Sequence, residues 1–176
     1  LSDNLEMLVH QKMTGHLLYG KWKEENGKWI SQIEGPLKKD PQNRFLHLIF
    51  FLDNGLQMAL SDLRKFAKVE LWGQEELSSA STLKNLGQDA LRISLAKFAE
   101  KIKSQKGKIK QVLMDQSFVA GIGNIYSDEI LFEAKINPQT ISKLLKQNQI
   151  KDIYGAMRVI LKSAIKQGGT SFSDFR

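Results

Sequence analysis

The sequence predicts an α+β fold, in which a partial antiparallel β-sandwich is followed by an all-α domain. Short apolar runs separated by turn residues fill the first third, whereas apolar residues recur with a period of 3.6 in the second half. A serine-rich stretch without clear periodicity lies between them. We therefore expect a β part at 1–75, a linker at 76–90, a helical domain at 91–168 and the beginning of a loop at 169–176.

The predicted strands are short apolar runs, at 7–10, 17–19, 45–52, 56–60 and 68–72. Asp53-Asn54-Gly55 joins two of them, and Asn-Gly between apolar runs favours a hairpin with a type I′ turn. The predicted helices are 91–102, 111–119, 124–134 and 150–165. Gly168-Gly169 is typical of the C-terminal end of a helix.

Composition limits the classes of function. Lys and Arg total 26 against 19 Asp and Glu, and this formal charge of +7 favours a polyanionic partner, although many proteins are mildly basic. The absence of cysteine excludes disulfides, thiolate metal sites and a cysteine nucleophile. No apolar run approaches the roughly 20 residues of a membrane span, and no signal peptide is evident. We expect a cytoplasmic protein with no membrane partner and no metal in this chain.

The segment Gly121-Ile122-Gly123-Asn124 joins two predicted helices and is a candidate phosphate site. Asn124 is a good N-cap, and free N–H groups at the positive end of a helix bind anions. The alternative is that the two glycines only permit a tight turn, since Gly-x-Gly alone is a weak signal. A lysine cluster lies upstream and is either a solvated helix face or part of a phosphate-binding surface. Its members are Lys97, Lys101, Lys103, Lys106, Lys108 and Lys110.

Arg64-Lys65-Phe66 lies between two predicted strands. Phe66 is either packed into the core or forms, with Arg64, an apolar wedge beside a cation, which suits entry into a stack of bases. Met13 lies in a predicted turn, where an exposed Met would be unusual; such a residue is more often in a core. We find no catalytic constellation, and the histidines His10, His16 and His47 are expected to be structural.

These residues resemble the formamidopyrimidine-DNA glycosylases. Residues 119–132 and 134–138, Val-Ala-Gly-Ile-Gly-Asn-Ile-Tyr-Ser-Asp-Glu-Ile-Leu-Phe and Ala-Lys-Ile-Asn-Pro, are similar to that family's helix-two-turn-helix signature. Further similarities follow in family order, at His10–Leu17, Asp62–Phe66, Leu86–Leu91, Lys108–Gln116 and Gly168–Phe175. The resemblance covers essentially the whole chain.

The resemblance implies roles for individual residues. Met13, Arg64 and Phe66 would enter the duplex and fill the space left by a flipped base. The phosphate-binding residues would be Lys106, Lys110, Gly121, Gly123 and Asn124, and the lesion-reading loop would begin at Thr170, Ser171 and Asp174. The implied partner is double-stranded DNA that contains an oxidised purine or an abasic site, bound by a monomer at the bacterial nucleoid.

Some family features have no counterpart in this chain. The N-terminal Pro that forms a Schiff base and the Glu that manages protons are missing, so no catalytic residue is expected here. The four-cysteine zinc finger is also missing, so zinc is expected only in a C-terminal finger of the full-length protein. Phe45 stands where the family usually has His, and Ala67 where it usually has Gly.

The expected function is therefore that of a base-excision repair glycosylase and abasic-site lyase that acts on 8-oxoguanine and formamidopyrimidines by β,δ-elimination. This chain would be its DNA-binding middle portion and inactive alone. The rival is a non-catalytic module that binds damaged DNA; RNA binding through the two-turn motif is a third possibility, disfavoured by the wedge residues.

Overall fold

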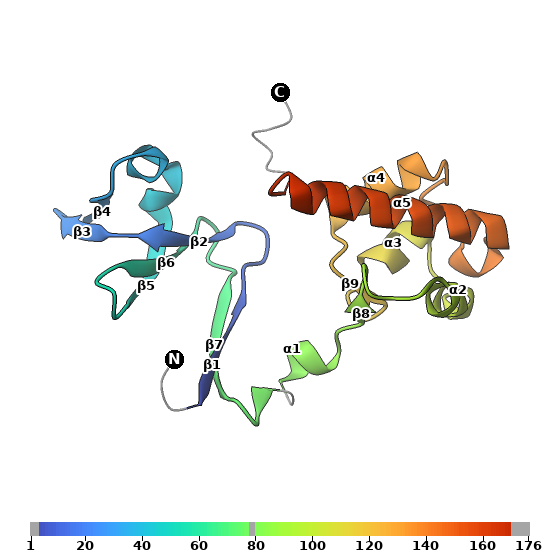
Figure 1. Ribbon diagram of the computed structural model, residues 1–176, viewed down its shortest axis with the longest axis horizontal. Coiled ribbons are helices and arrows are strands. Elements are labelled where there is room, and N and C mark those ends of the chain that lie inside the picture. The colour runs from blue at the N-terminus through green and yellow to red at the C-terminus, as the bar shows by residue number, and fades with distance from the viewer. Residues whose placement is uncertain (1–3, 78–79, 170–176) are drawn as a thin grey trace. The chain divides into compact units, whose positions relative to one another are not determined.

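The computed structural model describes residues 4–77 and 80–169, and its chain divides into two compact units, residues 1–78 and 79–176. The described part of the first unit contains β-strands and two short 3-10 helices, whereas the second is mainly helical (Figure 1). This arrangement confirms the predicted α+β class with an N-terminal β region.

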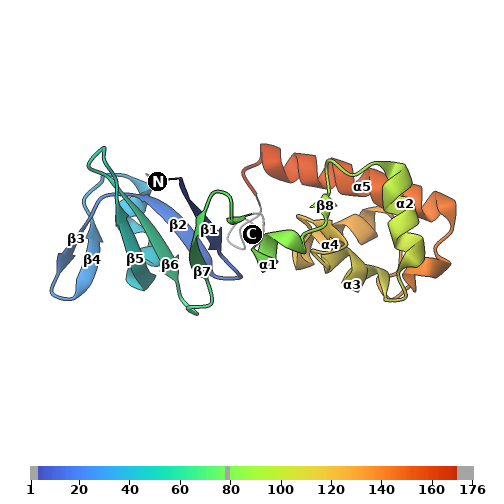
Figure 2. The same cartoon turned by 90° about the horizontal axis from the view of Figure 1, so that it is seen from below.

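Seven strands build the described part of the first unit. They are β1 Leu5–His10, β2 Gly15–Gly20, β3 Trp22–Glu25, β4 Lys28–Ser31, β5 Leu46–Phe51, β6 Gln57–Asp62 and β7 Lys68–Gly73. They form three antiparallel sheets, with strand orders β1-β7, β2-β6-β5 and β3-β4. Figure 2 shows β5, β6 and β2 side by side. The small core consists of Trp22, Leu46 and Ala59.

Two turns differ from the expectation. The type I′ geometry occurs at Asn26-Gly27, with φ of 53° and 73°, in the β3–β4 hairpin, which the apolar pattern did not predict. At the predicted hairpin only Gly55 has a positive φ, 77°. There the amide of Leu52 donates to the carbonyl of Leu56, which leaves a three-residue loop closed by glycine instead of a two-residue turn.

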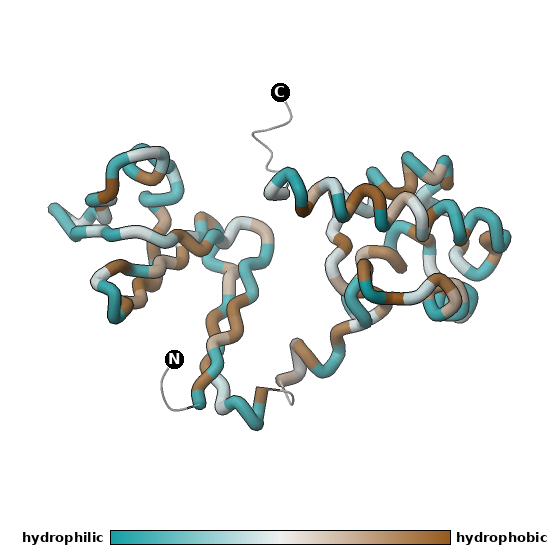
Figure 3. Tube along the Cα trace, viewed as in Figure 1, coloured by the Kyte–Doolittle hydropathy of each residue, from teal (hydrophilic) through white to brown (hydrophobic). Residues whose placement is uncertain are grey.

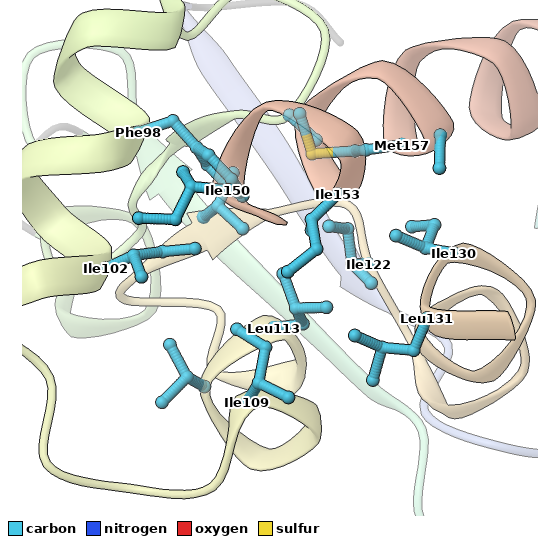
Figure 4. Packing of buried hydrophobic residues seen from close by; sticks show 14 of the residues in the cluster. Phe98, Ile102, Ile109, Leu113, Ile122, Ile130, Leu131, Ile150, Ile153 and Met157 are labelled. Atoms are coloured by element: carbon cyan, nitrogen blue, oxygen red, sulfur yellow. The ribbon is translucent and has the colours of Figure 1, made fainter. Parts of the chain in front are cut away.

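Besides a 3-10 helix at Ser142–Leu144, the second unit contains five α-helices and two very short strands in its described residues. They are α1 Ser81–Lys84, α2 Leu95–Ser104, α3 Ile109–Met114, α4 Asn124–Glu133, α5 Gln147–Lys166, β8 Gln88–Asp89 and β9 Val119–Ala120. Hydrophobic and hydrophilic bands alternate along α5 (Figure 3), as an amphipathic helix requires. Figure 4 shows Ile153 and Met157 of α5 among buried side chains of the other helices, including Ile102, Leu113 and Ile130.

The predicted helix 111–119 is wrong in its second half. Helix α3 ends at Met114, because the carboxylate of Asp115 accepts hydrogen bonds from the amide and the hydroxyl of Ser117. These bonds lower the pKa of Asp115 and offer the backbone a turn in place of another helical residue. Val119 and Ala120 then pair in parallel with β8.

The predicted ends of the other helices and of the linker lie closer to those in the structure. Helix α2 begins after Ser94, whose hydroxyl accepts a hydrogen bond from the amide of Lys97, instead of at residue 91. Helix α5 ends as Gly168-Gly169 predicts: their amides donate to the carbonyls of Ile165 and Ala164, which is a Schellman motif. The predicted linker 76–90 contains the unit boundary, but its later residues carry α1 and β8 of the second unit.

Candidate nucleic-acid interface

Strand register brings two loops of the first unit together. β1 pairs with β7 so that His10 faces Lys68, and β2 pairs with β6 so that Gly15 faces Asp62. The loop 11–14 joins β1 to β2, and the loop 63–67 joins β6 to β7. Because the strands pair at these ends, the two loops begin and end next to each other. Residues about 50 positions apart in the sequence thus become neighbours at one edge of the unit.

The three predicted wedge residues meet at these loops. The guanidinium Nη1 of Arg64 lies 3.6 Å from the sulfur of Met13, and its Cζ lies 4.7 Å from the ring centre of Phe66. Met13 is 80% exposed and Phe66 54% exposed, so neither belongs to the core. The structure thus brings Met13, Arg64 and Phe66 into one exposed cluster, which we call the wedge cluster. An exposed apolar cluster beside a cation is typical of an interaction site and suits a base stack.

Asp62, at the end of β6, builds the second loop. It is 1% exposed, and its Oδ2 accepts hydrogen bonds from the amides of Phe66 and Ala67, both at 2.7 Å. Its Oδ1 accepts from the amide of Arg64 at 3.1 Å and from the hydroxyl of Thr14 at 2.5 Å. These hydrogen bonds, that from Thr14 first, lower the pKa of Asp62 to about 2 although burial opposes the shift.

The departure at Ala67 is accommodated by the loop. Lys65, with φ of 55°, takes the left-handed conformation that such a loop requires. Ala67 lies against Gly15, where an added Cβ would come within 3.1 Å of the Ala67 side chain and 2.4 Å of the carbonyl oxygen of Gln11. Gly15 therefore provides the close approach of the two loops, and an alanine at 67 fits it.

The histidines make hydrogen bonds to nearby backbone. Nδ1 of His10 accepts from the amide of Lys12, and Nδ1 of His16 lies 3.1 Å from the carbonyl oxygen of Thr14. Nε2 of His47 lies 2.9 Å from the carbonyl oxygen of Asp62, the last residue of β6. Phe45, the second departure, is half-buried at the end of the 3-10 helix Pro41–Phe45.

In the second unit, Gln116 organises the turn that precedes α4. Its Oε1 accepts a hydrogen bond from the amide of Gly121 at 3.0 Å, and its Nε2 donates to the carbonyl of Ile122 at 2.7 Å. Gly121 has φ of 99°, a conformation that favours glycine. Because Gln116 occupies the Gly121 amide, that amide is not free for a phosphate in this arrangement.

The expectation that Asn124 caps α4 is wrong. Gly123 is the N-cap residue, Asn124 is the first helical residue, and no side chain caps the helix. The reason is geometric: Gly123 has the extended φ and ψ of −104° and −170° that a cap position requires. The amides of Asn124 and Ile125 find no acceptor in the described part of the chain, and the Asn124 side chain is exposed. The start of α4 thus presents unpaired donors to solvent.

Lys110 and Asp128 connect α3 to α4 beside these donors. Nζ of Lys110 lies 2.7 Å and 2.8 Å from the two carboxylate oxygens of Asp128, and the two side chains are 29% and 53% exposed. The predicted phosphate ligand Lys110 is therefore close to the first turn of α4, but it already has an anionic partner. A bound phosphate would compete with Asp128.

The lysine cluster divides into two groups. Lys101 donates to the carbonyl of Phe118 and stands over its ring, and Lys103 donates to the carbonyl of Leu145 at 2.5 Å, so both tie separate segments together. Lys106 is exposed in the loop between α2 and α3 and has no side-chain partner among the described residues. Only part of the cluster is thus available to an anion.

Three further predictions concern the lesion-reading loop, a metal site and a membrane-spanning helix. Thr170, Ser171 and Asp174 lie outside the described residues. The chain has no cysteine, and no three His, Asp or Glu side chains within the described ranges are placed to hold a metal ion. None of the helices in those ranges is long and apolar enough to cross a membrane.

Sequence reasoning missed Asp62 and Gln116 as organising residues. Asp62 carried a usable signal, since an Asp that ends a strand and precedes a short loop often accepts hydrogen bonds from the amides that follow it. Gln116 carried none, because a side chain that bridges five positions of an irregular turn has no sequence pattern. The pairing of Lys110 with Asp128 likewise needed the packing of two helices.

Comparison with known proteins agrees with this geometry. The family described as "Formamidopyrimidine-DNA glycosylase H2TH domain" matches residues 86–176. A formamidopyrimidine-DNA glycosylase of Crocosphaera subtropica is 40% identical over 173 residues, which are 96% of this chain and 55% of that protein. One from Desulforamulus reducens is 33% identical over 99% of this chain and 58% of its own length.

Solved structures are similar as well. A Lactococcus lactis Fpg mutant bound to DNA containing Fapy-dG has a TM-score of 0.78 and 28% identity, over 97% of this chain and 57% of that one. MutM bound to DNA with carbocyclic 8-oxo-G has a TM-score of 0.79 at the same identity, over 97% and 58%. The chain spans little more than half the length of these relatives. The family match, the fold and the ordered motifs together show that the chain belongs to the formamidopyrimidine-DNA glycosylase family.

Proposed function

We propose that the full-length protein is a base-excision repair enzyme that flips oxidised purines such as 8-oxoguanine and formamidopyrimidines out of DNA, excises them and cleaves the abasic site by β,δ-elimination. This chain supplies the DNA-binding middle portion and does not catalyse alone. The Schiff-base Pro, the acidic residue and a zinc finger are assigned to parts of the protein outside this chain, as in the family.

One observation carries the proposal: the exposed cluster of Met13, Arg64 and Phe66. A base inside a duplex is out of reach of an enzyme, and its extrusion costs a few kcal/mol that inserted side chains help to offset. Met13 and Phe66 would fill the vacated space, and Arg64, aligned against Phe66, would face the base left without a partner. Apolar side chains that gather in one exposed cluster are typical of a binding surface.

The start of α4 is assigned to a DNA phosphate. The unpaired amides of Asn124 and Ile125 are donors at the positive end of a helix dipole, where phosphate oxygens bind. Lys110 and Lys106 add positive charge, and Lys110 would exchange Asp128 for phosphate. Gly123 immediately precedes these amides, and even a Cβ there would meet no atom within 4 Å, so the approach to the amides is open.

The partner in this proposal is double-stranded DNA with an oxidised purine or an abasic site, bound by one copy of the protein. The named relatives are bacterial, and DNA is the substrate, so the proposed place of action is the nucleoid in the cytoplasm.

The test is to incubate the full-length protein with a duplex containing 8-oxoguanine and with borohydride, which reduces a Schiff base to a stable adduct. A trapped covalent complex and a cleaved strand are expected. Absence of the adduct, with selective binding to the damaged duplex retained, would instead identify the non-catalytic damage-binding module. Absence of both would refute the proposal.

A further inference from the structure

We propose that Asp62 is a positioning residue that holds the loops 11–14 and 63–67 together. It thereby sets the geometry with which Met13, Arg64 and Phe66 enter DNA. The proposal rests on the function proposed above and concerns the same site. Asp62 itself does not touch DNA in this view, because its carboxylate is buried beneath the loops that it organises.

The bonds of one carboxylate reach all three wedge residues. Oδ2 accepts from the amide of Phe66, and Oδ1 accepts from the amide of Arg64, so two of the three are held at their own backbone. The third, Met13, is held through its neighbour Thr14, whose hydroxyl donates to the same Oδ1. Thr14 and Asp62 are 48 positions apart, and their bond joins the loop 11–14 to the loop 63–67.

The four donors fill the carboxylate. With the amide of Ala67, each oxygen accepts two hydrogen bonds, which is the full capacity of a carboxylate. Asp62 therefore has no lone pair left to act as a base toward a substrate. Among the common side chains, only a carboxylate offers two acceptor oxygens and no donor, as these four bonds require.

Preorganisation is the expected gain. Met13 is tied to the other loop by an exposed contact with Arg64, which is weak alone, and through Thr14 by the part-buried hydrogen bond to Asp62. Without the carboxylate the three side chains would be ordered only as they enter the duplex, and this ordering would reduce lesion affinity. Binding to undamaged DNA rests on phosphate contacts and would not change.

Asp62→Asn is the direct test, because it keeps the shape but turns one acceptor into a donor that faces N–H or O–H groups. Asp53→Asn is the matched control: Asp53 is exposed in the β5–β6 loop, and the variant makes the same change in charge. Both are made in the full-length protein. Binding is measured to a duplex with an abasic-site analogue and to its undamaged counterpart.

We expect Asp62→Asn to lose about tenfold in affinity for the abasic duplex, which is the effect of one or more lost charge-assisted hydrogen bonds. Its affinity for undamaged DNA should equal that of Asp53→Asn. A 2-aminopurine next to the abasic site reports insertion directly, since its fluorescence rises when the stack opens. At saturating protein this rise should be smaller for Asp62→Asn than for Asp53→Asn. A merely destabilised protein would bind less but would give the full rise at saturation.

Thr14 provides a second test that does not depend on the folding of Asp62→Asn. Thr14→Ser retains the hydroxyl and should retain the 2-aminopurine signal, whereas Thr14→Val removes the hydroxyl at nearly constant volume and should reduce the signal. Equal signals for the two Thr14 variants, or an unchanged lesion preference in folded Asp62→Asn, would overturn the positioning role of Asp62 but leave the proposed function in place. A wild-type protein without any lesion preference removes the proposed function and the positioning role with it.

Discussion

Replacing Phe66 by alanine separates an exposed wedge from a core residue. Phe66 is 54% exposed and its ring contacts the guanidinium of Arg64, so the substitution removes a half-buried surface and one exposed cation–π contact. A fitting control is Leu46→Ala, because Leu46 is 9% exposed in the core of the same unit. The two variants should differ in stability although both truncate a large apolar side chain.

The magnitudes follow from burial. Complete burial of a Phe side chain is worth about 1.5–3 kcal/mol, so half-burial contributes about 1 kcal/mol. A cation–π contact at an exposed site adds about 0.5–1 kcal/mol. Phe66→Ala should therefore lower the free energy of unfolding by about 1.5–2 kcal/mol, the sum of these two parts. Leu46→Ala also leaves a cavity and should cost about 2–5 kcal/mol.

The assay is urea denaturation followed by tryptophan fluorescence. All three tryptophans, Trp22, Trp29 and Trp72, belong to the first unit, so the signal reports the unfolding of the unit that contains Phe66. The same variant in the full-length protein should lose affinity for an abasic duplex while keeping its affinity for undamaged DNA. A stability loss for Phe66→Ala equal to that for Leu46→Ala would refute the wedge assignment, and so would an unchanged lesion preference.

Further outcomes test the phosphate site and the loops. Lys110→Gln should weaken binding to damaged and undamaged duplexes alike and lower the slope of log affinity against log salt by about one. Asp128→Asn should strengthen binding at low salt, because it frees Lys110 from its ion pair; weaker binding would contradict the exchange with phosphate. Gln116→Ala should cost the helical unit about 0.5–1.5 kcal/mol, measured by circular dichroism during denaturation, and weaken DNA binding through the turn. Because the pKa of Asp62 is lowered in the folded protein, its stabilising effect should be complete above about pH 4 and lost as the pH falls toward 2. The difference in urea midpoint between wild type and Asp62→Asn should shrink over that range; a constant difference would contradict the ionised role.

Local patterns in the sequence were enough to predict much of the fold. The α+β class and the end of α5 at Gly168-Gly169 follow from hydrophobic period and from the freedom of glycine, and the structure confirms both. The errors arose where local alternatives compete. Asp115 ends α3 by accepting bonds from Ser117, and Gly123 takes the cap position from Asn124. In each case two local arrangements of the same few residues compete, and the sequence pattern alone did not show which of them forms.

The sequence by itself was enough to identify the family and to predict a β part followed by helices, and it proposed Met13, Arg64 and Phe66 as wedge residues, because motifs and periodicity are local properties of a chain. Only the tertiary structure decided which of these residues meet. The pairing of β1 with β7 and of β2 with β6 brings Thr14 to Asp62, and the packing of α3 against α4 brings Lys110 to Asp128. Contacts over such separations depend on strand register and helix packing, and no short stretch of sequence encodes either.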